Sequence, residues 1–422
     1  MFEFPLIPLV HVADIRMGQS PDSTYVQEGT EQGVPFLQGN AEFGVKYPTA
    51  KYSCIQPPRI AEPGSSLISV RAPVGETNIA DQTYCIGRGL SAVSFHRYGE
   101  VLGRELLNFH AKDLDKVSQG TTFAAISGNE LKSLLIAEIP EQEAAVLETI
   151  LDTLDTQIQK TEALIAKLEK VKEGLLHDLL TRGIDEDGRL RPSPEQAPEL
   201  YKESPLGLIP REWDALSIGQ LSVMVTSGSR GWAEYYSDSG DLFIRSQNVR
   251  MGVIDLTDQQ YVIPPCDGEG QRTSVSPCDL LVTITGNSVG NVAHLQEGWN
   301  RAAFVSQHVG LIRFLQPELS KFAEIFLVKG APGNGQLLDA QYGQSKPGLS
   351  LDNLKSIVIP IPPQHERDGL AGRIESIKAR ISAEKVSLDK LNIQKSGLMD
   401  DLLTGRVRVT PLLEQAQEAI PA

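Results

Sequence analysis

The sequence predicts an α+β protein in which two globular, mixed α/β domains lie at opposite ends of a long antiparallel two-helix coiled coil. Two observations support this prediction. A helical stretch with a heptad pattern occurs twice, at residues 140–182 and 363–405. The segments before it, residues 1–139 and 206–362, have the short apolar runs and Gly/Pro punctuation of strands joined by turns. A chain of 422 residues is long enough for two such domains and a spacer.

Apolar residues three or four positions apart form an a/d seam in both helical stretches, as a coiled coil requires. Two polar gaps interrupt each seam at corresponding places. Every residue of the second seam follows its counterpart by 223 positions. The first seam consists of Leu147, Leu151, Leu154, Ile158, Ile165, Leu168, Leu175 and Leu179, and the second of Leu370, Ile374, Ile377, Ile381, Leu388, Leu391, Leu398 and Leu402.

The same offset of 223 holds without a gap from Gly120 and Gly343 to Thr181 and Thr404. Two unrelated amphipathic helices are the simpler alternative, but they would not share their gaps and their ending. The pattern therefore indicates an internal duplication with pseudo-twofold symmetry. The first helix leaves one domain and reaches the other, so paired seams must run antiparallel. About forty residues give a spacer of about 60 Å.

The first globular domain is predicted to contain strands at residues 34–38, 66–71 and 90–95, a helix at 100–115 and a last strand at 134–139. Pro140 follows that strand, where the first turn of a helix tolerates proline. Residues 183–205, acidic and rich in proline, are expected to be a linker. The second domain carries longer loops than the first, and residues 406–422 form a C-terminal tail.

Composition limits the classes of protein. The formal net charge is −15, and no segment is strongly basic, since each globular domain carries a net charge of −4. Any contact with nucleic acid must therefore use clustered Arg and Lys or charge from a partner. The N-terminus does not resemble a signal peptide, and no apolar run approaches the ~20 residues of a membrane helix. Four cysteines without a CxxC spacing suggest buried thiols and a cytoplasmic location without membrane contact.

Catalytic motifs are mostly lacking. There is no P-loop, GxGxxG or zinc spacing, so we expect no catalytic residue, metal or cofactor in this chain. Residues 286–290 match the GxSxG nucleophile elbow around Ser288, with Asp339 and His365 downstream. A strand is expected to follow, however, which favours a hairpin turn over a serine hydrolase. Glu130 and Lys132 resemble part of a nuclease motif, but the second copy has Asn353 in place of the carboxylate.

Side chains suited to DNA gather in the glycine-bearing loops of both globular domains. Arg can bind guanine and Gln or Asn can bind adenine in the major groove, whereas Ser and Thr suit phosphates. Each of these residues could instead belong to an ordinary polar loop. The candidates are Gln19, Ser20, Gln38, Asn40, Arg71, Thr121 and Thr122 in the first domain, and Ser229, Arg230, Trp232, Tyr235, Arg245, Gln247, Asn248, Asn287, Gln344 and Lys346 in the second.

The chain as a whole resembles the specificity subunit of type I restriction–modification systems. The similarity is carried by residues 359–364 (IPIPPQ), 395–406 (KSGLMDDLLTGR), 228–232 (GSRGW) and 281–286 (LVTITG), together with the duplicated helix. The first copy departs from the pattern at residues 138–142 (EIPEQ), which lack the paired prolines.

The resemblance implies that each globular domain reads one half of a bipartite target in double-stranded DNA. The helices would set the gap and, through their seams, dock two modification subunits that use S-adenosylmethionine. Restriction subunits that use ATP and Mg²⁺ are possible further partners, and this subunit would itself be non-catalytic. A coiled-coil adaptor whose globular ends bind protein is the alternative from another class. The Arg and Gln residues in paired glycine loops favour DNA.

Overall fold

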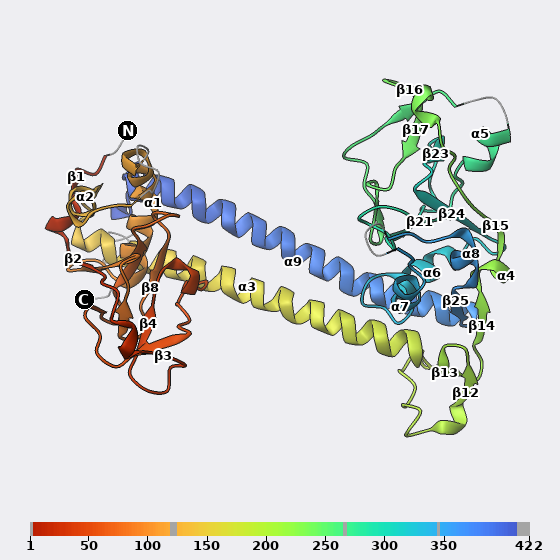
Figure 1. The fold of residues 1–422 in the computed structure, drawn as a ribbon, viewed down its shortest axis with the longest axis horizontal. Coiled ribbons are helices and arrows are strands. Elements are labelled where there is room, and N and C mark those ends of the chain that lie inside the picture. Colours follow the sequence, from red (N-terminus) through yellow and green to blue (C-terminus); the bar gives the residue numbers. More distant parts are fainter. Residues whose placement is uncertain (1–2, 119–124, 265–267, 344–346, 412–422) are drawn as a thin grey trace. The chain divides into compact units, whose positions relative to one another are not determined.

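The computed structural model describes residues 3–118, 125–264, 268–343 and 347–411. The chain forms two compact units, and each contains parts of both long helices. Unit 1 comprises residues 1–163 and 385–422, and unit 2 comprises residues 164–384. Figure 1 labels many of their helices and strands. None of the helices among the described residues is long and apolar enough to cross a membrane.

Unit 1 contains two sheets and a short antiparallel pair. The four-stranded sheet has the order β2-β10-β7-β8, the five-stranded sheet the order β3-β5-β4-β9-β6, and β1 pairs with β11. The strands are β1 (Leu6–Pro8), β2 (Ala13–Met17), β3 (Val26–Glu28), β4 (Val34–Leu37), β5 (Tyr52–Cys54), β6 (Ile60–Ala61), β7 (Ser66–Ser69), β8 (Thr77–Ile79), β9 (Tyr84–Ile86), β10 (Leu90–Phe95) and β11 (Leu135–Ala137). The α-helices are α1 (Glu100–Ser118), α2 (Gly128–Ser133), the first part of α3 (Glu141–Thr181) and the last part of α9 (Gln364–Thr404).

Unit 2 repeats this arrangement. Its four-stranded sheet β15-β24-β21-β22 corresponds to β2-β10-β7-β8, and the pair β14-β25 corresponds to β1-β11. A second sheet, β16-β20-β17-β23, contains the parallel pair β17–β23, as β4–β9 is parallel in unit 1. The strands are β14 (Asp214–Ser217), β15 (Ser222–Ser227), β16 (Tyr236–Ser237), β17 (Asp241–Ile244), β20 (Tyr261–Val262), β21 (Leu280–Thr283), β22 (Val292–His294), β23 (Ala303–Val305), β24 (Val309–Phe314) and β25 (Val358–Ile361). The predicted duplication is therefore present in the strand order itself.

Unit 2 also contains two further hairpins, several α-helices and the last part of α3. The hairpins are β12 (Tyr201–Ser204) with β13 (Gly207–Pro210) and β18 (Val249–Arg250) with β19 (Val253–Ile254). The helices are α4 (Ile218–Leu221), α5 (Gly268–Thr273), α6 (Leu319–Leu327), α7 (Asn334–Asp339), α8 (Leu351–Ser356) and the first part of α9 (Gln364–Thr404). The segment expected to be a linker is thus partly ordered, since β12 lies within it and Ile184 bridges Leu190.

Sequence predicted the two long helices to within one residue at each end, whereas α1, expected to end at residue 115, continues to Ser118. Both long helices span 41 residues and follow a proline, Pro140 or Pro363. Shortly before them, α2 and α8 begin with equivalent capping boxes, in which Ser127 bonds Glu130 and Ser350 bonds Asn353. Glu130 therefore caps a helix, which accounts for the residue that resembled part of a nuclease motif.

The two long helices pack antiparallel within each unit. In unit 1, Leu147 and Leu151 near the start of α3 share the core with Leu402 near the end of α9. In unit 2 the pairing is reversed, and Leu179 near the end of α3 shares the core with Leu370 near the start of α9. The start of one helix meets the end of the other in both cores.

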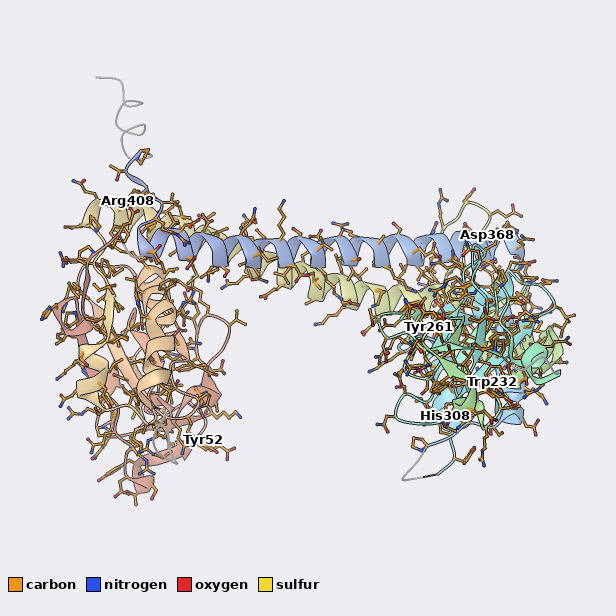
Figure 2. The ribbon with its side chains drawn as sticks, turned by 90° about the horizontal axis from the view of Figure 1, so that it is seen from above. Tyr52, Trp232, Tyr261, His308, Asp368 and Arg408 are labelled. Carbon is orange, nitrogen blue, oxygen red and sulfur yellow. The ribbon has the colours of Figure 1, made fainter. Side chains whose placement is uncertain are left out.

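A buried glutamate at the start of each long helix binds an arginine that follows the end of the other. In unit 1, Glu143 is 4% exposed and accepts hydrogen bonds from the Arg408 guanidinium, whose Nε lies 3.1 Å from both carboxylate oxygens. Figure 2 labels Arg408 just beyond α9. In unit 2, Glu366 is 1% exposed and accepts bonds from Arg191 and, at 2.9 Å, from Trp213 Nε1. Each ion pair ties the chain that leaves one helix to the beginning of the other.

Unit 1 also has a buried ionic network between α1 and both long helices. Arg104 of α1 lies 2.6 Å from Asp155 of α3, and Lys395 of α9 lies 2.6 Å from the same carboxylate. Glu105 completes the network by binding both cations. Two cations and two carboxylates offset one another, so α1 is fixed against both long helices without an unpaired buried charge.

Candidate nucleic-acid interface

Strand direction brings the DNA-suited loops of unit 2 to one edge of its four-stranded sheet. At this edge β15 ends at Ser227, β24 begins at Val309, and the β21–β22 hairpin turns between Thr283 and Val292. Because neighbouring strands are antiparallel, the loop after β15, the turn before β24 and the hairpin turn lie together. The chain after β17 joins them, since Ser306 N donates to Ile244 O. We call this the polar edge of unit 2.

Unit 1 has an equivalent polar edge. There β2 ends at Met17, β10 begins at Leu90, and the β7–β8 hairpin turns between Ser69 and Thr77. The chain after β4 lies beside them, because Gly87 N donates to Leu37 O. Four separate chain segments again meet at one end of the sheet.

A glycine is required at the centre of each polar edge. A Cβ atom on Gly18 would lie 2.2 Å from Gly87 O, and one on Gly228 would lie 2.1 Å from Val305 O. Both distances are far below van der Waals contact. The oxygen atoms belong to the backbone, so they cannot rotate away as the end of a side chain could. The glycines thus let the loop after β2 or β15 lie directly on the strand of the neighbouring sheet.

Most candidates of unit 1 lie on its polar edge. The side chains of Gln19, Ser20, Gln38 and Arg71 are exposed, and Arg71 forms a bridge with Ala125. The candidates Thr121 and Thr122 lie outside the described residues. Asn40 is half-buried and donates to Glu76 Oε2 at 2.7 Å, so it supports the hairpin.

In unit 2, Arg230, Gln247 and Asn287 are exposed at the polar edge. The exposed Arg230 has no hydrogen-bond or ion-pair partner among the residues that the structure describes, so its guanidinium is available to a ligand. Thr285 of the hairpin turn forms a bridge with Gly348. The candidates Gln344 and Lys346 lie outside the described residues.

Two candidates are not on the surface, which corrects the expectation that they contact DNA. Trp232 is 2% exposed and stacks on Phe243 with ring centroids 5.4 Å apart. Asn248 is also 2% exposed and donates to the carbonyl groups of Asp255 and Asp258. Tyr235 is half-buried against Trp232. These residues build the core and turns beneath the loops, because the second sheet needs an aromatic core of its own.

Two further candidate side chains bind the carboxylate of Asp258. Arg245 lies 3.0 Å from Asp258, and Gln247 Nε2 donates to the same carboxylate at 2.7 Å. Phosphate would be repelled by Asp258, so Arg245 and Gln247 suit a base edge better than the DNA backbone.

The structure adds Arg272 of α5, which sequence reasoning missed. Arg272 Nη1 donates to Thr226 Oγ1 and Ser227 O, each at 2.6 Å, and Nη2 donates to Ser229 Oγ. It therefore holds the glycine loop of unit 2 in place and engages Ser229, a predicted contact. A lone arginine in a six-residue helix gave no signal in the sequence.

The GxSxG segment forms a turn between two strands and not a nucleophile elbow. Ser288 lies in the hairpin turn between β21 and β22, as the simpler interpretation predicted, and no helix follows it. No group of three or more His, Cys, Asp or Glu side chains in the described segments is placed to bind a metal ion. Burial and the neighbouring Cys54 raise the pKa of the Cys85 thiol to about 12. Cys278, expected to be buried, is partly exposed.

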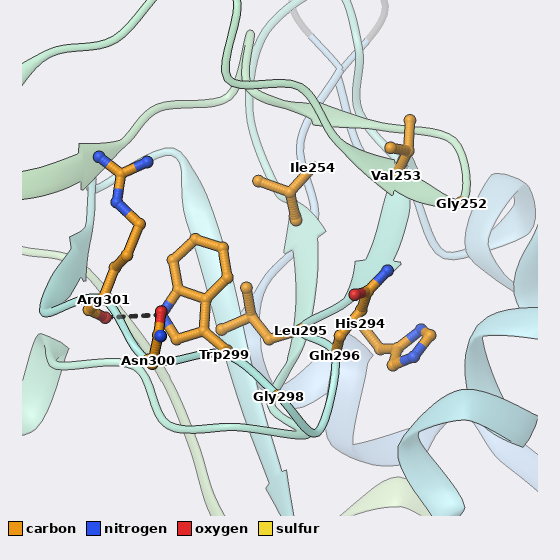
Figure 3. A pocket seen from close by; sticks show the side chains of 10 residues that line it. All are labelled: Gly252, Val253, Ile254, His294, Leu295, Gln296, Gly298, Trp299, Asn300 and Arg301. Atoms are coloured by element: carbon orange, nitrogen blue, oxygen red, sulfur yellow. Dashed lines mark hydrogen bonds between the residues drawn. The ribbon is translucent and has the colours of Figure 1, made fainter.

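A cavity of about 310 Å³ lies at the opposite edge of the unit 2 sheet, where β22 ends and β23 begins. Figure 3 shows Trp299 and Arg301 on one side of it and His294 on the other. Trp299 Nε1 donates to Arg301 O at 2.7 Å, and His294 Nδ1 lies 2.6 Å from Glu324. The polar groups of Trp299 and His294 are thus hydrogen-bonded within the protein. The cavity lies at the other end of the sheet from the polar edge.

Known proteins resemble the chain over much of its length, although no protein-family model matches it. The specificity subunit of the type I restriction enzyme MjaX of Methanocaldococcus jannaschii is 36% identical over 170 residues, which are 40% of each chain. The MjaVIII specificity subunit of the same organism is 22% identical over 301 residues, 71% of this chain and 68% of that protein. The EcoBI specificity subunit of Escherichia coli is 21% identical over 300 residues, 69% of this chain and 61% of that protein.

The chain is thus similar to several specificity subunits of type I restriction enzymes. Two solved structures share its fold. The S subunit of the type I restriction–modification system of M. genitalium has a TM-score of 0.58 at 15% identity, over 95% of this chain and 96% of that one. A chain from the type I R-M system studied for complex assembly and conformational transition has a TM-score of 0.57 at 14% identity, over 95% and 98%.

The predicted seam of the two long helices is buried mainly near the helix ends, which differs from a continuous coiled-coil seam. Leu154 is only half-buried, because the buried position beside it is taken by Asp155, which faces Arg104. Leu398 is 37% exposed, whereas its neighbour Leu402 is 3% exposed. The buried seam residues are Leu147, Leu151, Leu168, Leu179, Leu370, Ile374, Ile381 and Leu402, and the half-buried ones are Leu154, Ile158, Ile165, Leu175, Ile377, Leu388 and Leu391.

Proposed function

We propose that this chain is the DNA sequence-recognition subunit of a type I restriction–modification complex, in which the globular part of each unit reads one half of a bipartite target. The repeated polar edge is the observation that carries the proposal. Both edges are built from the same four chain segments around a close-packed glycine, Gly18 or Gly228. Their exposed side chains differ, which suits one scaffold reading two different half-sites.

The charge of the polar edges fits recognition better than general affinity for DNA. Exposed arginines such as Arg71 and Arg230 lie among Gln, Ser and Asn side chains, and each globular domain has a net charge of −4. Such a surface cannot neutralise many phosphates by itself. Partner subunits that also contact the DNA backbone would supply the missing positive charge.

The long helices support a further part of the proposal, which concerns the spacing of the half-sites and the docking of partner subunits. They would set the distance between half-sites and dock two modification subunits, and restriction subunits could join the complex. The half-exposed stretch of the seam, which includes Leu391 and Leu398, offers apolar surface for such docking. S-adenosylmethionine, ATP and Mg²⁺ would be bound by those partners, and the complex would act in the cytoplasm.

The test is to express the chain with its modification subunits and to map methylated adenines. We expect one motif with two constant parts separated by a gap of fixed length. The purified chain alone, supplied with S-adenosylmethionine, ATP and Mg²⁺, is expected neither to methylate nor to cleave DNA. A single uninterrupted motif, or turnover by the isolated chain, would contradict the proposed function. Complexes that form but bind no duplex would favour an adaptor.

A further inference from the structure

One tight turn lies at the centre of the polar edge in unit 1. Residues 87–89 (Gly-Arg-Gly) touch every other segment of that edge. Gly87 N donates to Leu37 O, Val70 N donates to Gly89 O, and Leu90 N closes the turn on Gly87 O. A Cβ atom on Gly18 would lie 2.2 Å from Gly87 O, which places the glycine loop on the remaining side.

The two glycines of this turn fit it closely against the chain after β4. A Cβ atom at either position would come within 3.0 Å of the Gln38 carbonyl oxygen. Arg88 between them is exposed, and it has no hydrogen bond or ion pair with any residue that the structure describes. The polar edge therefore presents the free guanidinium of Arg88 at its centre. The chain segments that contain Gln19, Gln38 and Arg71 pack around this turn.

Unit 2 has the same turn at residues 306–308 (Ser-Gln-His). Three backbone hydrogen bonds correspond one to one with those of unit 1: Ser306 N to Ile244 O, Ile284 N to His308 O, and Val309 N to Ser306 O. Gly228 lies against it as Gly18 lies against residue 87, since its Cβ would be 2.3 Å from Ser306 C. Gln307 is therefore the structural equivalent of Arg88.

Gln307 is positioned by its neighbours. Its Nε2 lies 3.2 Å from His308 Nε2, and His308 Nδ1 is hydrogen-bonded to Thr285 Oγ1. His308 is exposed, and Figure 2 shows it on the part of unit 2 away from α9. A half-buried glutamine held by a histidine loses less conformational entropy on binding than a free surface side chain.

We propose that Arg88 and Gln307 are specificity-determining residues, each contacting a base from the centre of its polar edge; the proposal rests on the proposed function. Arg suits the O6 and N7 acceptors of guanine, and Gln suits the N7 acceptor and N6 donor of adenine, in bidentate geometry. Arg88 thus specifies a guanine in the half-site read by unit 1. Gln307 specifies an adenine in the half-site read by unit 2.

The decisive variant is Arg88→Ala in the full chain, assembled with its modification subunits. Methylation rates are measured on duplexes that carry each base in turn at every position of both half-sites. We expect the preference for guanine to fall about ten- to hundredfold at one position of one half-site. The other half-site should be unchanged. Gln307→Ala should lower the preference for adenine at one position of that other half-site.

Arg97→Ala is the matched control, because Arg97 follows the other end of β10 and pairs with Glu138 at 3.3 Å. It removes the same charge from the same domain and should alter no base preference. An equal loss on all sequences with a shallower salt dependence would assign Arg88 to a phosphate and overturn the proposal. So would an unchanged preference at every position. If the complex that contains the chain without substitutions has no bipartite target, the proposed function itself fails.

Discussion

Replacing Glu366 by alanine should destabilise unit 2 strongly, because its carboxylate joins three parts of that unit. It accepts hydrogen bonds from Ile184 N at 2.7 Å, from Trp213 Nε1 at 2.9 Å and from Arg191. Glu366→Ala leaves the Arg191 side chain, of which only 10% is exposed, with Glu212 as its remaining carboxylate partner and Arg182 O as its remaining carbonyl acceptor. It also leaves two N–H groups without an acceptor.

Removing one partner of a buried ion pair costs about 3–5 kcal/mol. For a unit of this size, that loss corresponds to a fall in Tm of roughly 10 °C. The three tryptophans of the chain, Trp213, Trp232 and Trp299, all belong to unit 2, so tryptophan fluorescence during urea unfolding reports this unit alone. With m near 2 kcal/mol/M, the midpoint should fall by about 1.5–2.5 M.

Glu375→Ala is the matched control on the same helix. Glu375 pairs with Lys321 at 2.6 Å, but both side chains are about half exposed. Surface pairs contribute about 0–1 kcal/mol, so this variant should unfold almost as the parent protein does. If Glu366→Ala costs no more than Glu375→Ala, the ion pair does not hold the start of α9 to the chain that leaves α3.

Three further predictions concern other parts of the molecule. The hydrogen bond from Arg408 holds the pKa of Glu143 below its usual value of 4.5. The stabilisation of the folded state by the Glu143 carboxylate is therefore present above pH 4.5 and is lost as pH falls through the folded-state pKa. Glu143→Gln should weaken this dependence of stability on pH, which urea unfolding followed by circular dichroism at about pH 7 and about pH 4 measures. Gly228→Ala forces a Cβ to 2.1 Å from Val305 O, so methylation mapping should show recognition lost in one half-site only. Seven residues inserted at matching places in both long helices keep the heptad register, add about 10 Å to each and should widen the gap by about three base pairs between unchanged half-sites.

Periodic features of the fold could be predicted from sequence to within a residue. The ends of α3 and α9 followed from the heptad pattern and from Pro140 and Pro363. The turn around Ser288 was predictable because a strand pattern continued after it. Contacts between distant segments were not predictable in this way. The ion pairs of Glu143 with Arg408 and of Glu366 with Arg191 join positions far apart in the chain, with no local signal.

Composition alone could not distinguish loop residues that face solvent from those that build the loop. Trp232 and Asn248 suit DNA contacts by residue type, yet they are buried, because the second sheet and its turns use them. Conversely, Arg88 sits in a Gly-Arg-Gly turn that gives no more signal than an ordinary loop. Only the hydrogen bonds that match this turn to Ser306–His308 reveal its central place.

The most direct test of independent reading by the two units is an exchange of one globular domain. Residues 206–362 are replaced by the equivalent segment of another specificity subunit, both long helices are kept, and adenine methylation is mapped with the same modification subunits. We predict that one half-site changes to that of the donor, while the other half-site and the gap stay the same. A change in both half-sites, or in neither, would contradict the account.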